Sequence, residues 1–404
     1  MLSKHWLRHN IGFTGLIYLA LAIPFQDYLS PYPAFGLLLF QLILSRKQLN
    51  TNWTPLSWIS IGIFLLALLL AIPFTETSMK TVQKLIPLFI TACFLPYLSF
   101  SREQIHHVWQ VFAVSIGLSF YLSLIAGLPA YFQNGDTSQF FYMKLCVFLE
   151  RQPHYLALFS ACAIMFLGSN ALPSIKQLSK GKQIGLGLLT ISLLAFLMML
   201  SARAQIFSFA IVAFFAVLIY FKQQGKTRKG ILLGIIALTG FSLAVLSSPK
   251  ARERLENSFQ KADITIDETG KEDPRIITWN TALDLILEKP LLGHGTGKAN
   301  KALQDKAAEE GHSILKKKKL NYHNQYLQAW ASNGILGLLL LLSLLAYWSR
   351  LLWKNKQWYL IASLSLFCLS MLTESMLQRQ AGVIFMCFLL LSTLDSKSAS
   401  PYEK

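Results

Sequence analysis

The sequence predicts an all-α, polytopic membrane protein with about 12 transmembrane helices and one large, partly helical loop outside the membrane. Three observations carry this prediction. The 404-residue chain is 53% hydrophobic and only 14% charged, whereas about a quarter of the residues in soluble domains are charged. Its apolar residues form runs near the length of about 20 residues that crosses a bilayer. Its basic residues lie between these runs, as topogenic loop charges do.

Twelve apolar runs are each bounded by charge, Pro or Gly. They lie near 11–27, 33–45, 56–74, 82–100, 105–128, 153–171, 184–201, 203–221, 230–247, 333–353, 357–374 and 380–394. The runs divide the chain into spans one to nine (1–247), a polar loop (248–332) and three last spans with a tail (333–404).

Loop charge predicts the orientation. Alternate short loops carry 17 Lys and Arg against three acidic residues, Glu103, Asp395 and Glu403. The positive-inside rule therefore places both termini in the cytoplasm. The long loop then faces outward, into the periplasm of a Gram-negative cell. ATP and nucleotide sugars are absent there, so an enzyme on that side needs a donor already energised and carried across in lipid.

The charge and cysteine patterns exclude other classes of partner and cofactor. The net charge of +17 is spread over loops rather than gathered in one patch, so membrane lipid is expected as a partner and nucleic acid is not. The five cysteines lie mostly in or beside apolar runs without a CxxC spacing. Neither a disulfide framework nor a zinc site is expected, and no metal or other cofactor is predicted.

Several ionisable residues gather at the outer ends of the expected spans. Arg151 and His154 open the sixth span, and Arg203 stands at the tight turn before the eighth. Glu374 and Arg379 flank the turn before the last span. An arginine at the centre of a membrane helix costs about 2.5–3.5 kcal/mol on insertion scales, so such residues usually have a partner or a task. Each alone could be a side chain that reaches the lipid headgroups; their convergence on one face favours a shared site.

The polar loop has recognisable parts. Asp273 and Pro274 form a helix start, and residues 275–288 have apolar side chains at helical spacing. This helix is expected on the membrane surface or against the bundle. The segment Gly293–Gly297 is read as a structural turn, or as a turn whose amides hold a lipid diphosphate. The run Lys316–Lys319 is either a solvated segment or a segment that attracts anionic lipid or glycolipid phosphate.

His323 is the candidate catalytic residue of this loop. It lies about ten residues before a span, within Asn321–Asn324, and therefore near the outer membrane surface. A histidine can take a proton from a sugar hydroxyl near neutral pH. An exposed histidine without a task is the alternative.

These residues resemble the bacterial O-antigen ligase and polymerase superfamily. His323-Asn324, nine residues, Gly334, two residues and Gly337 match the ligase-type pattern. The segments 275–279 and 289–295 are similar to the arginine–tryptophan helix and the proline–leucine–leucine–glycine turn of the family. Ser201 and Arg203 are similar to its serine–arginine step, with the departure that Ala202 stands between them.

The resemblance implies a glycosyltransferase that needs no metal or ATP. It makes His323 the general base, which deprotonates the acceptor hydroxyl and leads to inversion at the anomeric carbon. Arg203 and Arg275 are implied to bind the diphosphate of an undecaprenyl-linked glycan. Asn324 orients the imidazole or a sugar hydroxyl, and Arg151, His154, Glu374 and Arg379 are further substrate-binding candidates.

The acceptor separates the possible functions. A ligase passes the glycan to lipid A-core, a polymerase to another lipid-linked repeat, and an O-oligosaccharyltransferase to a protein. The His-Asn pattern favours the ligase, at the periplasmic side of a bacterial inner membrane. A flippase or transporter for lipid-linked glycans is the alternative of a different class, but no ionisable residue stands at the middle of any expected span.

Overall fold

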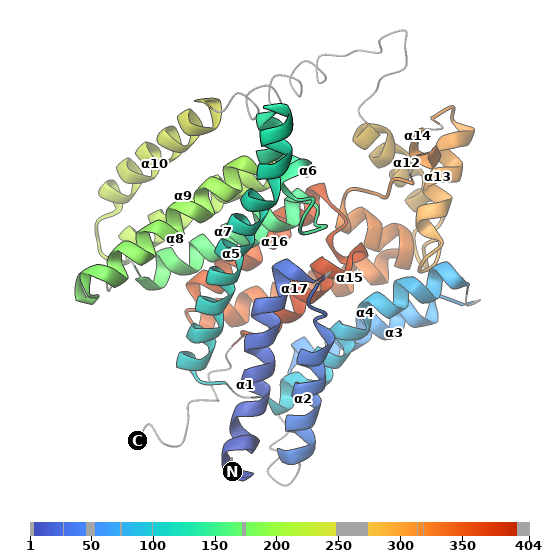
Figure 1. Cartoon of the computed structure of the whole chain (residues 1–404). Helices are drawn as coiled ribbons and strands as arrows, with labels where there is room; N and C mark the ends of the chain where they lie inside the picture. Colours follow the sequence, from blue (N-terminus) through green and yellow to red (C-terminus); the bar gives the residue numbers. More distant parts are fainter. Residues whose placement is uncertain are drawn as a thin grey trace.

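The computed structural model describes residues 4–26, 28–45, 53–72, 75–98, 100–171, 175–247, 274–312, 314–317 and 319–393 (Figure 1). This part of the chain is helical and contains no β-strand. Its α-helices are α1 (Lys4–Ala22), α2 (Tyr32–Ser45), α3 (Pro55–Leu69), α4 (Glu76–Phe94), α5 (Arg102–Asn134), α6 (Tyr142–Leu145), α7 (Pro153–Ala171), α8 (Lys180–Met199), α9 (Arg203–Gln223), α10 (Thr227–Ser247), α12 (Pro274–Glu288), α13 (Ala299–Glu309), α14 (Ile314–Lys317), α15 (Gln325–Lys354), α16 (Trp358–Thr373) and α17 (Gln380–Leu391).

The all-α class is confirmed, whereas the number of twelve spans is not. Each apolar run of the sequence overlaps one of these helices. By length and composition, four helices of the described part can cross a membrane: α5, α8, α9 and α15. On α8 the exposed apolar side chains Ile184, Leu188 and Ile191 recur at helical spacing. Such a stripe fits a helix face turned to lipid.

The centre of the bundle is α17, whose residues 381–391 are all buried. A helix that is apolar on every side is stable only when other helices surround it. It packs on α4 and α16. Its Phe385 stacks with Phe112 of α5, and its Phe388 lies tilted against the same ring. This aromatic core fixes the end of α16 relative to the start of α17, which is where Glu374 and Arg379 lie.

The helices α12, α13 and α14 form a separate group beside the long helices (Figure 1). Their own small core contains Ile277, Leu285, Leu303 and Tyr322. The expected N-cap at Asp273 lies outside the described residues. The predicted packing of this helix on the bundle is supported, because α12 contacts α15.

Only some of the apolar residues at helical spacing in α12 are buried. Ile276, Leu283 and Leu287 are exposed, whereas Ile277 and Ile286 are buried. Apolar residues occur on two sides of this helix, so periodicity alone does not select the side that packs.

The helix α15 is broken at Gly334, which has φ +66° and ψ −171° in the middle of the helix. The break frees backbone groups, and the turn after α12 satisfies them. The amides of His294 and Gly295 donate to the carbonyls of Ala331 and Ser332. The amide of Ile335 donates to the carbonyl of Pro290. The expected span at 333–353 therefore begins at this break, while the helix itself begins at Gln325.

Gly334→Ala is expected to reduce strongly the amount of folded protein. A Cβ at this position would lie 1.9 Å from the carbonyl oxygen of Leu291, and the backbone strain alone costs on the order of 1–3 kcal/mol. Accumulation in membranes and the thermal unfolding temperature of the purified variant measure the effect. Gly36→Ala is the control, because Gly36 is exposed on α2 with open space around it. Equal accumulation of the two variants would contradict the proposed close approach.

Candidate active site

His323 stands immediately before α15 in a strained conformation, with φ +46°. Its neighbours hold it there. The Tyr322 side chain is fully buried and donates to the carbonyl of Ala299 at 3.0 Å. The Trp279 indole donates to the carbonyl of Tyr322 at 3.1 Å. These contacts anchor the histidine segment to α12 and α13, and they give the tryptophan of α12 a positioning role.

The imidazole of His323 contacts Glu374, the residue that follows α16. The distance from Nδ1 to Glu374 Oε2 is 3.1 Å. Since an ionised carboxylate can only accept, the hydrogen of this bond belongs to Nδ1. In the neutral ring Nε2 then carries the lone pair, and it makes no hydrogen bond within the described residues. The pair thus has the geometry of a general base with an orienting carboxylate.

Arg275 at the start of α12 binds the other oxygen of the same carboxylate, with 3.1 Å between Nη2 and Oε1. Burial raises the pKa of Glu374, but the hydrogen bond from His323 and the positive charges nearby outweigh it. Its pKa lies below the usual value as a result. Glu374 is therefore ionised at neutral pH and fixes two of the predicted site residues.

His154 and Arg379 belong to the same cluster. His154, in the first turn of α7, interacts electrostatically with Glu374, His323, Arg275 and Arg379. The hydroxyl of the next residue, Tyr155, donates to the carbonyl of Met376 at 3.2 Å. This bond joins the start of α7 to the turn between Glu374 and Arg379.

Arg151 and Arg203 lie at the same end of the bundle. Arg151 precedes α7 and interacts electrostatically with Tyr155. Arg203 begins α9. Because α8 follows α7 after a short connection and packs against it, the end of α8, and with it the start of α9, lies at the same end as the start of α7. The short connection through Ser201, which has φ +47°, fixes that position.

Asn324 has a structural task, and the orienting role expected for it stays a prediction. It is the N-cap of α15, and its side-chain oxygen accepts from the amides of Tyr326 and Leu327. N-cap bonds satisfy amides that would otherwise lack partners at a helix start. The Asn that follows the motif histidine thus sets where the helix begins.

The glycine-rich turn is structural, because protein carbonyls already occupy its amides. The amides of Gly293, His294, Gly295 and Thr296 donate to the carbonyls of Lys289, Ala331, Ser332 and Leu70. These amides are therefore not available to a lipid diphosphate. The side chain of His294 lies 2.8 Å from the carbonyl of Leu285, which makes it part of the same packing.

Lys84 on α4 is a further candidate for the site, one that the sequence motifs do not single out. Its Nζ donates to the carbonyl of Gln378 at 3.2 Å, and it interacts electrostatically with Arg379. Its signal in the sequence is a lysine near the start of an otherwise apolar run, which is costly without a task. Two cations side by side favour an anion between or above them.

Comparison with known proteins assigns part of the chain to a family. Residues 188–342 match a family described as O-antigen ligase, and this match places that part of the chain in the O-antigen ligase and polymerase superfamily. Members are glycosyltransferase-like ligases and polymerases that act on a lipid-linked glycan and a glycan acceptor. With the apolar helices, the match indicates a membrane protein.

One curated relative is an uncharacterized protein of Haemophilus influenzae. It is 28% identical over 139 residues, which cover 31% of this chain and 33% of the relative. The chain thus matches about a third of the length of this relative. The family match includes Arg203, Arg275 and His323, whereas Glu374 and Arg379 lie beyond its end.

Proposed function

We propose that the protein is an O-antigen ligase-like glycosyltransferase, which moves a glycan from undecaprenyl diphosphate to a hydroxyl of lipid A-core. The hydrogen bond between His323 Nδ1 and Glu374 is the observation that carries the proposal. It leaves Nε2 as the basic nitrogen at a site surrounded by cations. A polymerase or a protein O-oligosaccharyltransferase would use the same chemistry with another acceptor.

The reaction is a displacement at the anomeric carbon. His323 Nε2 takes the proton of the acceptor hydroxyl, and the oxygen attacks the face opposite the leaving group. The bond to the diphosphate oxygen breaks, and the anomeric configuration inverts. Glu374 stabilises the imidazolium that forms. This division of tasks is that of a general base oriented by a carboxylate.

The cations of the site would stabilise the leaving group. Undecaprenyl diphosphate gains negative charge as it leaves, and fixed positive groups lower the barrier when they face that charge. Arg379 lies on the turn before α17, Lys84 of α4 is its neighbour, and Arg275 approaches from α12. Arg151 and Arg203 complete the set at the same end of the bundle.

The charge of the short loops supports the location proposed for this reaction. An excess of Lys and Arg on alternate loops favours cytoplasmic termini. The site at the other end of the bundle then faces the periplasm from the inner membrane. A lipid-linked donor suits that compartment because nucleotide sugars do not reach it.

Deletion of the gene in its native host tests the function and the acceptor together. A ligase predicts lipopolysaccharide without O-chains and accumulation of lipid-linked glycan. A single repeat on the core indicates a polymerase instead, and an unchanged lipopolysaccharide with altered glycoproteins indicates a protein glycosyltransferase. Electrophoresis of lipopolysaccharide and extraction of polyprenyl-linked glycan give the measurements. Normal profiles of all three products would overturn the proposal.

Arg203→Lys and Arg275→Lys are each expected to lower transfer by about 10²-fold, as the loss of one fixed transition-state donor does. Lysine keeps the charge but cannot make the bidentate contact of a guanidinium. The rate of transfer by purified protein is the measurement. Arg350→Lys is the matched control, because Arg350 is an exposed residue near the opposite end of α15. Full activity in both site variants would leave these arginines with a folding role only.

A further inference from the structure

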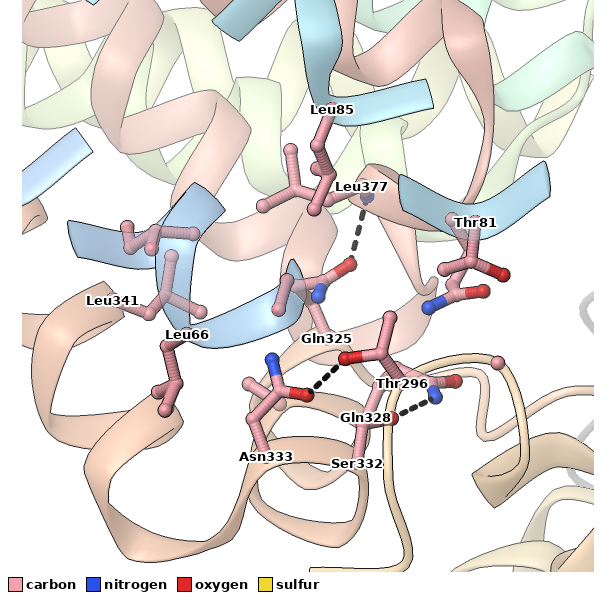
Figure 2. A pocket seen from close by; sticks show the side chains of 16 residues that line it. Leu66, Thr81, Leu85, Thr296, Gln325, Gln328, Ser332, Asn333, Leu341 and Leu377 are labelled. Atoms are coloured by element: carbon pink, nitrogen blue, oxygen red, sulfur yellow. Dashed lines mark hydrogen bonds between the residues drawn. The ribbon is translucent and has the colours of Figure 1, made fainter. Parts of the chain in front are cut away.

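A pocket lies beside the turn that carries Glu374, because Leu377 and Gln378 of that turn line it. Figure 2 shows the side chains around this pocket. It lies between α3, α4 and α15, and Gly297 of the glycine-rich turn closes one side. Gln325 and Leu377 connect the pocket to the proposed site. Gln325 stands two positions after His323, and its side-chain oxygen accepts from the amide of Leu377 at 2.7 Å.

The pocket has a polar wall without charge. Among the residues that line it, the polar side chains are amides and hydroxyls, and none is Lys, Arg, His, Asp or Glu. Leu66, Leu85 and Leu341 line another part of it (Figure 2). Lys84 and Arg379 lie near it but do not line it. An anionic ligand would therefore find its counter-charges outside this pocket.

Some hydrogen-bonding groups of the polar wall have no partner in the described part of the chain. Gln328 is only 2% exposed, and its Oε1 is buried without a hydrogen bond. Its Nε2 is held by Ser332 at 2.8 Å, which fixes the orientation of the amide. The Oδ1 of Asn333 accepts from Thr296 at 2.9 Å, which leaves the Asn333 amide nitrogen as a donor (Figure 2).

Acceptors and donors are thus fixed side by side on one wall. A buried polar group is costly unless a partner satisfies it. A hydroxyl is both donor and acceptor, so a ring with several hydroxyls can bind both kinds of group at once. A ligand that has only donors or only acceptors cannot bind both.

We infer that this pocket is a subsite for an uncharged sugar ring of the glycan substrate. Gln328 accepts from one hydroxyl, and Asn333 and Gln325 donate to others. The leucines cover the apolar face of the ring. This inference rests on the proposed glycosyl transfer, and it names uncharged sugars, as opposed to uronic acids, as the substrate class next to the reacting bond.

Binding of simple sugars to the purified full-length chain in detergent tests the inference. Saturation-transfer NMR is recorded with glucose and N-acetylglucosamine as uncharged probes and with glucuronate as the anionic probe. The uncharged sugars are expected to give signals and to compete with each other, and glucuronate is expected to give a weaker one. A stronger signal from glucuronate, or none from either uncharged sugar, would overturn the inference.

Gln328→Met removes the buried acceptor at nearly constant size. It is expected to weaken binding about fivefold, as the loss of one hydrogen bond does. Gln224→Met, at an exposed position after α9, is the matched control and should bind as the wild type does. If Gln328→Met does not fold, Thr81→Val on the opposite wall replaces it with the same expectation. Wild-type affinity in the folded variant would overturn the inference.

The two proposals fail separately. His323→Ala should bind the uncharged sugars normally, because His323 does not line the pocket. Loss of transfer in this variant with normal sugar binding supports both proposals. Sugar binding without any effect of His323→Ala on transfer removes the general base but keeps the subsite. Loss of transfer in His323→Ala, together with no sugar binding by the wild-type protein, removes the subsite and keeps the general base.

Discussion

Replacing His323 by alanine should abolish glycan transfer while the protein still inserts into the membrane. A general base contributes about 10²–10⁴-fold to the rate, and His323 is the histidine whose Nδ1 is held by a carboxylate. The side chain makes one hydrogen bond within the described residues, so the fold loses little. The transfer rate and the amount of protein in the membrane are the two measurements.

His312 provides the control for this prediction. It lies in the same polar segment but outside the histidine motif, and its side chain makes no hydrogen bond with the described residues. His312→Ala should therefore transfer normally. His294 is less suitable, because its ring lies against the carbonyl of Leu285. Near-normal transfer by His323→Ala, with strong loss in His294→Ala or Glu374→Ala, would show that the base is misassigned.

Glu374→Gln is expected to lower transfer by about 10²–10⁴-fold, as removal of a carboxylate that orients a catalytic histidine does. The amide keeps the size of the side chain. It loses the charge that stabilises the imidazolium, and it can present its NH₂ group to Nδ1 and favour the wrong tautomer. Arg275 loses its ion pair at the same time. The transfer rate at constant membrane accumulation measures this effect.

The pH dependence of the rate tests whether ionisation of Glu374 limits the reaction. The pKa of Glu374 is held below its ordinary value, so its ionised form and the contacts it makes are present above that value. They are lost only as the pH falls through the lowered pKa. An acid limb of the rate profile above about pH 5 therefore belongs to another group. Such a limb should persist in the residual activity of Glu374→Gln.

Glu288→Gln is the control for the charge change. Glu288 pairs with Lys306 at the surface of the α12–α13 group, and exposed pairs contribute about 0–1 kcal/mol. This variant should transfer at nearly the wild-type rate. A Glu374→Gln variant that transfers as well as Glu288→Gln would exclude the orienting role of Glu374.

The sequence determined the class of the protein and the local parts of its site. Apolar runs placed the helices, because burial and lipid contact require continuous apolar segments whatever their neighbours are. The superfamily followed from short motifs around His323 and Arg275, and the family match confirmed it. The order of the helices also predicts that four ionisable residues lie at one end of the bundle: Arg151, His154, Glu374 and Arg379.

Only the tertiary structure decided which residues touch. His323 and Glu374 are 51 residues apart, and Lys84 reaches the turn before α17 from α4. No local pattern encodes such contacts, since they depend on how α16 and α17 pack against the rest of the bundle. The structure also gave Asn324 and Gly334 their tasks. The cap and the helix break are backbone requirements, and the turn that completes the break comes from a segment about 40 residues earlier in the chain.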